Sequence, residues 1–243
     1  MMNFLVFSAL FFPIVLAGFS IFLFTTSSRN LKLITAFSGA FLLSISFVDI
    51  LPEIYQSKQS NIIGLFILLG FFIQLILDFL TKGVEHGHVH HQHDPHEKHV
   101  VSPIPVMIGI CIHSFLEGMP LAENFHLQTL TNTLLTGIVI HNIPISIVLM
   151  SLLLHYGYSR RKSIILLMIF AFSSPLGVII SYFVGGALLI NTEMFFNVIM
   201  AMVVGIFLHI STTILFESDE HHRFNLLKFI TIMIGAGLAY LIG

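Results

Sequence analysis

Long apolar stretches, separated by short polar connections, follow one another along the whole chain. A helix needs about 20 apolar residues to cross the ~30 Å hydrocarbon core of a bilayer, and it satisfies its own backbone hydrogen bonds there. The first stretch lacks the basic segment and cleavage site of a signal peptide, so we expect it to be a helix. The pattern therefore predicts an all-α integral membrane protein, a single transmembrane domain over residues 1–243, with eight helices at 4–24, 34–55, 61–80, 104–122, 129–153, 163–189, 195–216 and 226–242.

The composition agrees with a lipid solvent. Of the 243 residues, 56% are hydrophobic and 9% are charged, and the mean hydropathy is +0.97. So few charged side chains cannot cover a globule in water, which excludes a soluble protein. Cys111 is the single cysteine, so an intrachain disulfide and a structural thiolate zinc site are excluded as well.

The basic residues are divided unevenly between the two sides of the predicted membrane domain. If the eight helices alternate in direction, every lysine and arginine except Lys58 falls on one side. The side rich in basic residues is normally cytoplasmic. We therefore expect a multi-pass protein of a plasma membrane, such as the bacterial inner membrane, with both termini outside the cytoplasm.

A histidine-rich connection, residues 82–101, lies between the third and fourth predicted helices on the cytoplasmic side. It is hydrophilic and holds seven of the 14 histidines of the chain. Neighbouring neutral imidazoles bind zinc, nickel or copper ions without a fixed frame. We expect the loop to bind metal, with an inert linker as the alternative. Its histidines are His86, His88, His90, His91, His93, His96 and His99.

Polar side chains inside the fourth and fifth helices carry the main functional hypothesis, because ionisable groups at membrane depth are costly and usually functional. His113 and Glu117 are four residues apart, so they share one face of the fourth helix. His141 lies near the middle of the fifth helix. Two imidazoles and a carboxylate at similar depth can bind one dication, zinc first. The alternative is a protonated Glu117 that is hydrogen-bonded to His113 as a packing pair.

Five further polar residues are weaker candidates. Ser114, Asn142 and Ser146 flank the predicted ligands and could give weak or water-mediated contacts. Asp49, near the external end of the second helix, could attract cations, although a hydrated helix end explains it equally well. His209, in the inner half of the seventh helix, could line an exit route.

Together these features resemble the ZIP (Zrt-, Irt-like protein) family of metal transporters. The likeness extends over nearly the whole chain and includes the eight spans, the histidine-rich loop and four motifs: HSFLEG at 113–118, HNIP at 141–144, LPE at 51–53 and SPLG at 174–177. The resemblance implies a 3+2+3 bundle, in which inverted repeats of three helices surround a central pair. It also implies that His113, Glu117 and His141 are metal ligands.

The resemblance further bears on the number of ions. Binuclear members of the family carry a bridging carboxylate four residues after the fifth-helix ligand, where this chain has Ile145. No acidic residue occurs in the predicted sixth helix, 163–189. We therefore expect one intramembrane ion.

The expected function is transport of a divalent transition metal toward the cytoplasm, not enzymatic catalysis. Zinc is favoured, and iron, manganese and cadmium stay open. The metal is the substrate, with no cofactor expected. The partners are the ion and the bilayer, with no nucleic acid, and a homodimer is left open. Alternatives are an exporter of the cation diffusion facilitator type, which usually has six spans and a cytoplasmic domain, and a membrane metal sensor without transport. An intramembrane hydrolase is disfavoured because the chain has no HExxH pair or nucleophile elbow.

Overall fold

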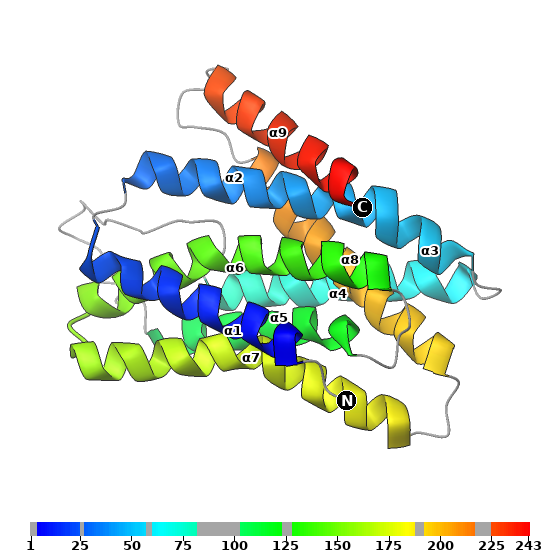
Figure 1. Ribbon diagram of the computed structural model, residues 1–243, viewed down its shortest axis with the longest axis horizontal. Coiled ribbons are helices and arrows are strands. Elements are labelled where there is room, and N and C mark those ends of the chain that lie inside the picture. Colours follow the sequence, from blue (N-terminus) through cyan, green and yellow to red (C-terminus); the bar gives the residue numbers. More distant parts are fainter. Residues whose placement is uncertain are drawn as a thin grey trace.

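The computed structural model describes residues 4–24, 27–56, 60–81, 103–122, 128–187, 192–216 and 225–243, and within these ranges it is a bundle of helices without strands (Figure 1). A π-helical turn, Ser46–Ile50, joins α2 to α3, and 3-10 turns extend α1 and α5. The α-helices are α1 (Phe4–Phe19), α2 (Ser28–Ile45), α3 (Leu51–Tyr55), α4 (Ser60–Thr81), α5 (Pro103–Gly118), α6 (Gln128–His155), α7 (Arg160–Ala187), α8 (Thr192–Phe216) and α9 (Leu226–Ile242).

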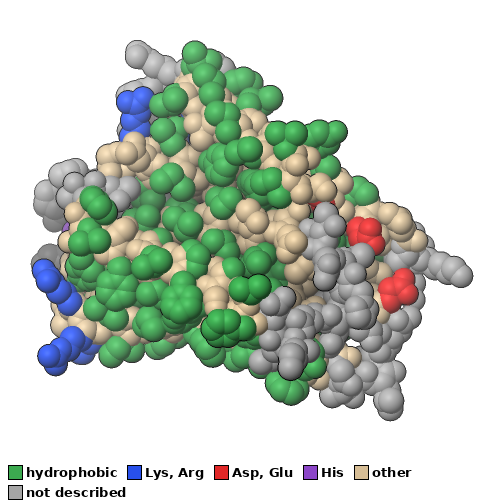
Figure 2. All heavy atoms as spheres, viewed as in Figure 1, with side chains coloured by type: hydrophobic (Ala, Val, Ile, Leu, Met, Phe, Trp, Pro, Cys, Tyr) green, Lys and Arg blue, Asp and Glu red, His purple; other side chains and the backbone are tan. Residues whose placement is uncertain are grey.

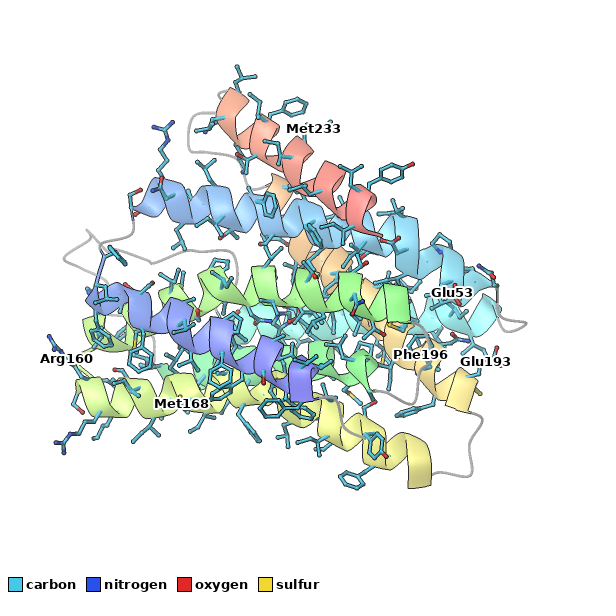
Figure 3. All side chains as sticks on the ribbon, viewed as in Figure 1. Glu53, Arg160, Met168, Glu193, Phe196 and Met233 are labelled. Atoms are coloured by element: carbon cyan, nitrogen blue, oxygen red, sulfur yellow. The ribbon has the colours of Figure 1, made fainter. Side chains whose placement is uncertain are left out.

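The described helices are long and apolar enough to form a membrane bundle. Seven segments meet the length and hydropathy of a membrane span, with α2, the π-helical turn and α3 counted as one. The 17-residue α9 is the eighth, at the lower limit of spanning length. Outward-facing side chains are apolar, as Met168 of α7 and Met233 of α9 illustrate (Figure 3). The all-α membrane bundle predicted from the sequence is confirmed.

The second span differs from its prediction in two ways. It begins at Ser28 and not at position 34, because Ser27 caps the helix by accepting the Asn30 N–H at 3.2 Å. These first turns are polar, so a hydropathy window misses them. The span also widens into the π-helical turn before Pro52. Proline cannot donate the hydrogen bond of a regular α-helix, which accounts for the irregular turn at this place.

The two ends of the bundle carry opposite charges. Arg160 lies at one end, whereas Glu53 and Glu193 lie at the other (Figure 3). An apolar band separates the basic and acidic ends (Figure 2). The first helix runs from the acidic side toward the basic end, and α9 runs back (Figure 1). The start of α1 and the end of α9 are therefore directed to the same side of the bundle, the acidic one.

The helices pack in two groups, and within each group the contacts repeat as an inverted repeat requires. In one group, α8 packs against α4 and α2, and α2 also packs against α9. In the other, α5 packs against α7, and α1 packs against α6 and α7. Exchanging α1 with α7, α2 with α8, α4 with α9 and α5 with α6 maps the α4–α8 contact onto α9–α2. The same exchange maps α1–α6 onto α7–α5, as expected for a 3+2+3 bundle.

Glycines bring two of these helix pairs into backbone contact. Gly70 of α4 and Gly205 of α8 each lie so close to the backbone of the facing helix that an added Cβ would overlap it. Gly118 of α5 and Gly177 of α7 do the same. In lipid, small residues at helix crossings allow this close packing. The end of α5 that carries Glu117 is thereby held against α7.

Candidate metal site

His113, Glu117 and His141 converge inside the bundle, and all three side chains are fully buried. One ligand atom from each residue lies within 4.8 Å of the other two. On α5, Nε2 of His113 is 3.2 Å from Oε1 of Glu117. The ring of His141, from α6, stands nearly perpendicular to that of His113, with 5.8 Å between centroids. The residues chosen from the sequence as ligands thus meet at one place.

The donor set suits a transition metal that must be released again. Imidazole nitrogen and carboxylate oxygen are normal zinc ligands, and three protein ligands leave coordination positions open. The described part of the chain contains no second group of three histidine, cysteine, aspartate or glutamate residues with this spacing.

Asn142 orients the carboxylate of Glu117. Its Nδ2 donates to Oε2 of Glu117 at 3.1 Å and also to the carbonyl oxygen of Ile138, one turn earlier on α6, at 3.0 Å. Oε1 of Glu117 is buried and accepts no hydrogen bond within the described residues. A buried carboxylate oxygen is costly to leave uncompensated, and a cation at Oε1 would offset that cost.

Two residues that the sequence analysis did not select contact the imidazoles. Oε1 of Gln74, on α4, is 3.0 Å from Nδ1 of His113. Oγ of Ser38, on α2, is 3.4 Å from Nδ1 of His141. Both side chains are fully buried. The sequence could have indicated Gln74, because it is the one polar side chain between positions 61 and 78. It could not have singled out Ser38, because α2 holds several hydroxyl residues.

Ser114 and Ser146 lie next to predicted ligands in sequence but make other contacts. The Ser114 hydroxyl is 2.6 Å from the Ser174 hydroxyl of α7, which in turn donates to the Ser114 carbonyl oxygen at 2.9 Å. Ser146 donates to the carbonyl oxygen of Ile143 on its own helix at 2.7 Å. The structure therefore occupies both hydroxyls in helix packing.

Asp49 and His209 do not belong to the three-residue cluster. Asp49 belongs to the π-helical turn and, with Glu53 and Thr133, lines a pocket of about 290 Å³. The ring of His209, on α8, packs edge-on against that of Phe71 on α4, with 5.0 Å between centroids. The position of Asp49 fits a mouth at the acidic end of the bundle. A role for His209 in an exit route stays a prediction from the sequence.

The histidine-rich loop falls outside the described residues. Metal binding by its seven histidines, His86, His88, His90, His91, His93, His96 and His99, stays a prediction from the sequence.

Comparisons with known proteins place the chain among zinc transporters. The family model described as ZIP Zinc transporter matches residues 85–243, which include all three clustered residues. Zinc transporter ZIP9 of Micropogonias undulatus is 27% identical over 123 residues, which cover 49% of this chain and 38% of that protein. Zinc transporter ZIP9-B of Xenopus laevis is 26% identical over 134 residues, which cover 53% and 43%. The similarity thus spans less than half the length of these relatives.

Proposed function

Because the chain belongs to the ZIP zinc transporter family, we propose that it carries a divalent transition metal, zinc first, across a membrane through His113, Glu117 and His141. The observation that carries this proposal is the burial of two imidazoles and a carboxylate within 4.8 Å of one another inside a bundle of membrane-spanning helices. The family match and the bundle of about eight spans argue against a cation diffusion facilitator and against a sensor without transport.

The donor set favours zinc. Two nitrogen ligands and one oxygen ligand suit a borderline-soft ion with flexible coordination. Manganese and iron accept such sites more weakly, in the usual order of affinities for divalent metals. Cadmium remains a competitor for the same ligands.

One ion occupies the site at a time. Ile145, where binuclear family members carry a bridging carboxylate, is buried among apolar side chains that include Met107 and Ile110. Ser114 and Ser174 bond to each other on the neighbouring α5–α7 face. Neither position offers a charged ligand for a second ion.

The ion moves from the acidic end of the bundle to the basic end. By the positive-inside rule, the end with Arg160 faces the cytoplasm, and both termini lie outside. The pocket lined by Asp49 and Glu53 then opens outside, where its carboxylates raise the local concentration of cations.

Zinc uptake into proteoliposomes tests this function, with two histidines of α6 as a matched pair. His141→Ala removes a ligand and should reduce uptake by at least about tenfold, since even the loss of a supporting residue of a metal site commonly costs 10–100-fold. His155→Ala removes an exposed histidine from the same helix and should leave uptake near the wild-type rate. Equal uptake by the two variants would refute the assignment of the site.

A further inference from the structure

The contacts of Ser38 indicate which nitrogen of a neutral His141 ring carries the proton. A serine hydroxyl has one hydrogen to donate. That of Ser38 goes to the carbonyl oxygen of Thr35 at 2.9 Å. Toward Nδ1 of His141, Oγ of Ser38 can therefore only accept. The hydrogen of the neutral ring then lies on Nδ1, and Nε2 is the nitrogen with the lone pair.

His113 is held in the same tautomer by a different group. The atom that faces its Nδ1 is the carbonyl oxygen of Gln74, which can only accept a hydrogen bond. In the neutral ring of His113, the hydrogen again lies on Nδ1. Nε2 of His113 then turns its lone pair toward Oε1 of Glu117, 3.2 Å away. Two lone pairs at this distance repel each other, and a cation between them removes the repulsion.

From these contacts we propose that Gln74 and Ser38 are positioning residues for the transported ion. They hold the proton on Nδ1 of His113 and His141 and so present both Nε2 atoms, with Oε1 of Glu117, to the metal. A ligating imidazole must offer a nitrogen without a proton, and the partner of its other nitrogen sets both tautomer and ring orientation. The inference rests on the proposed function.

The placement of Ser38 and Gln74 agrees with a role in positioning the metal-binding imidazoles. The ligands come from α5 and α6, whereas Ser38 and Gln74 come from α2 and α4, which supply no ligand. Both are fully buried, so water does not replace their acceptor atoms. The contact of Gln74 is the shorter one, 3.0 Å against 3.4 Å, and its loss should have the larger effect.

Zinc uptake and equilibrium zinc binding by the purified full chain test the inference. Gln74→Met keeps the length of the side chain and removes the acceptor. We expect the KM for zinc uptake and the Kd for zinc to rise about 10–100-fold, with a smaller change in maximal rate. Gln74→Glu restores an acceptor and should bring the KM back toward the wild-type value. Ser38→Ala should raise the KM less than Gln74→Met does.

Matched controls come from the same spans. Thr81→Val on α4 and Ser46→Ala in the second span remove buried hydroxyls that, among the described residues, donate to the backbone of their own helix, at Asp78 and Leu42. Both should keep the wild-type KM. A purely structural role for Gln74 predicts a different pattern, in which Gln74→Glu, with its added buried charge, is more damaging than Gln74→Met.

The result that overturns the inference is a folded Gln74→Met protein with the wild-type KM and Kd. If Gln74→Met does not fold, two other variants decide in its place: Gln74→Asn, whose shorter amide withdraws from His113, and Ser38→Ala. A wild-type KM and Kd for zinc in both variants would refute the inference. A wild-type chain that binds zinc through His113 but transports none would refute the proposed function and leave the inference standing. The binding constants of the same variants would then still decide the inference.

Discussion

Glu117→Gln keeps the shape of the site and exchanges one ligand atom, because Asn142 dictates how the new amide lies. Nδ2 of Asn142 donates both to Oε2 of Glu117 and to the carbonyl oxygen of Ile138. The glutamine must therefore point its oxygen toward Asn142. Its NH2 group then takes the place of Oε1, 3.2 Å from Nε2 of His113, and donates a hydrogen bond to it. A donor now blocks the position that faced the ion.

The effect on zinc binding follows from the loss of a buried charged partner. Removing one member of a buried charge pair costs about 3–5 kcal/mol. At about 1.4 kcal/mol per tenfold, the Kd for zinc should rise roughly 10²–10⁴-fold. With free zinc at about 100 times the wild-type Kd, bound zinc stabilises the wild-type fold by about 2.7 kcal/mol. In the variant, the same zinc concentration equals the Kd or less, so the stabilisation falls to at most about 0.4 kcal/mol.

Denaturant unfolding in detergent, with and without zinc, measures this difference in the free energy of unfolding. If the histidine-rich loop binds zinc equally in the folded and the unfolded chain, that binding does not change the free energy of unfolding. The control is Glu193→Gln, which removes an exposed carboxylate in the first turn of α8 and should keep the full stabilisation by zinc. If Glu117→Gln is stabilised by zinc as strongly as Glu193→Gln, Glu117 is not a ligand.

Three further outcomes are expected. Deletion of residues 84–99 should change the apparent affinity or regulation of zinc uptake and leave uptake itself in place; an inserted deletion protein without uptake would contradict this. Gly205→Ala should lower the free energy of unfolding by about 1–3 kcal/mol, because its Cβ overlaps the Ile67 carbonyl, whereas Gly237→Ala, with open space around its Cβ, should be nearly neutral. Joint Asp49→Asn and Glu53→Gln substitution should slow uptake up to about tenfold at low salt and less at 0.15 M, where charges are screened beyond ~8 Å; a salt-independent effect would argue against an electrostatic mouth.

The amino-acid sequence by itself determined the all-α set of spans and placed His113 and Glu117 on one face of α5. The side that each connection faces stays a prediction from the basic residues. Hydropathy is a local property, so eight apolar stretches predict eight helices whatever their neighbours are. The spacing of His113 and Glu117 places them on one face because an α-helix turns once in 3.6 residues. His141 needed one further premise, that its helix lies beside α5 at similar depth, and the short connection between these two antiparallel helices supplied it.

Only the tertiary structure decided which side chains surround these ligands. Ser38 and Gln74 reach the site from helices that are distant from His141 and His113 in the sequence, and no periodicity within α2 or α4 indicates that contact. The same holds for Ser114, which bonds to Ser174 because glycines bring α5 and α7 together. Neighbours of a ligand depend on how helix surfaces fit one another. That fit is a property of pairs of helices, whereas the pattern of one helix specifies only its own faces.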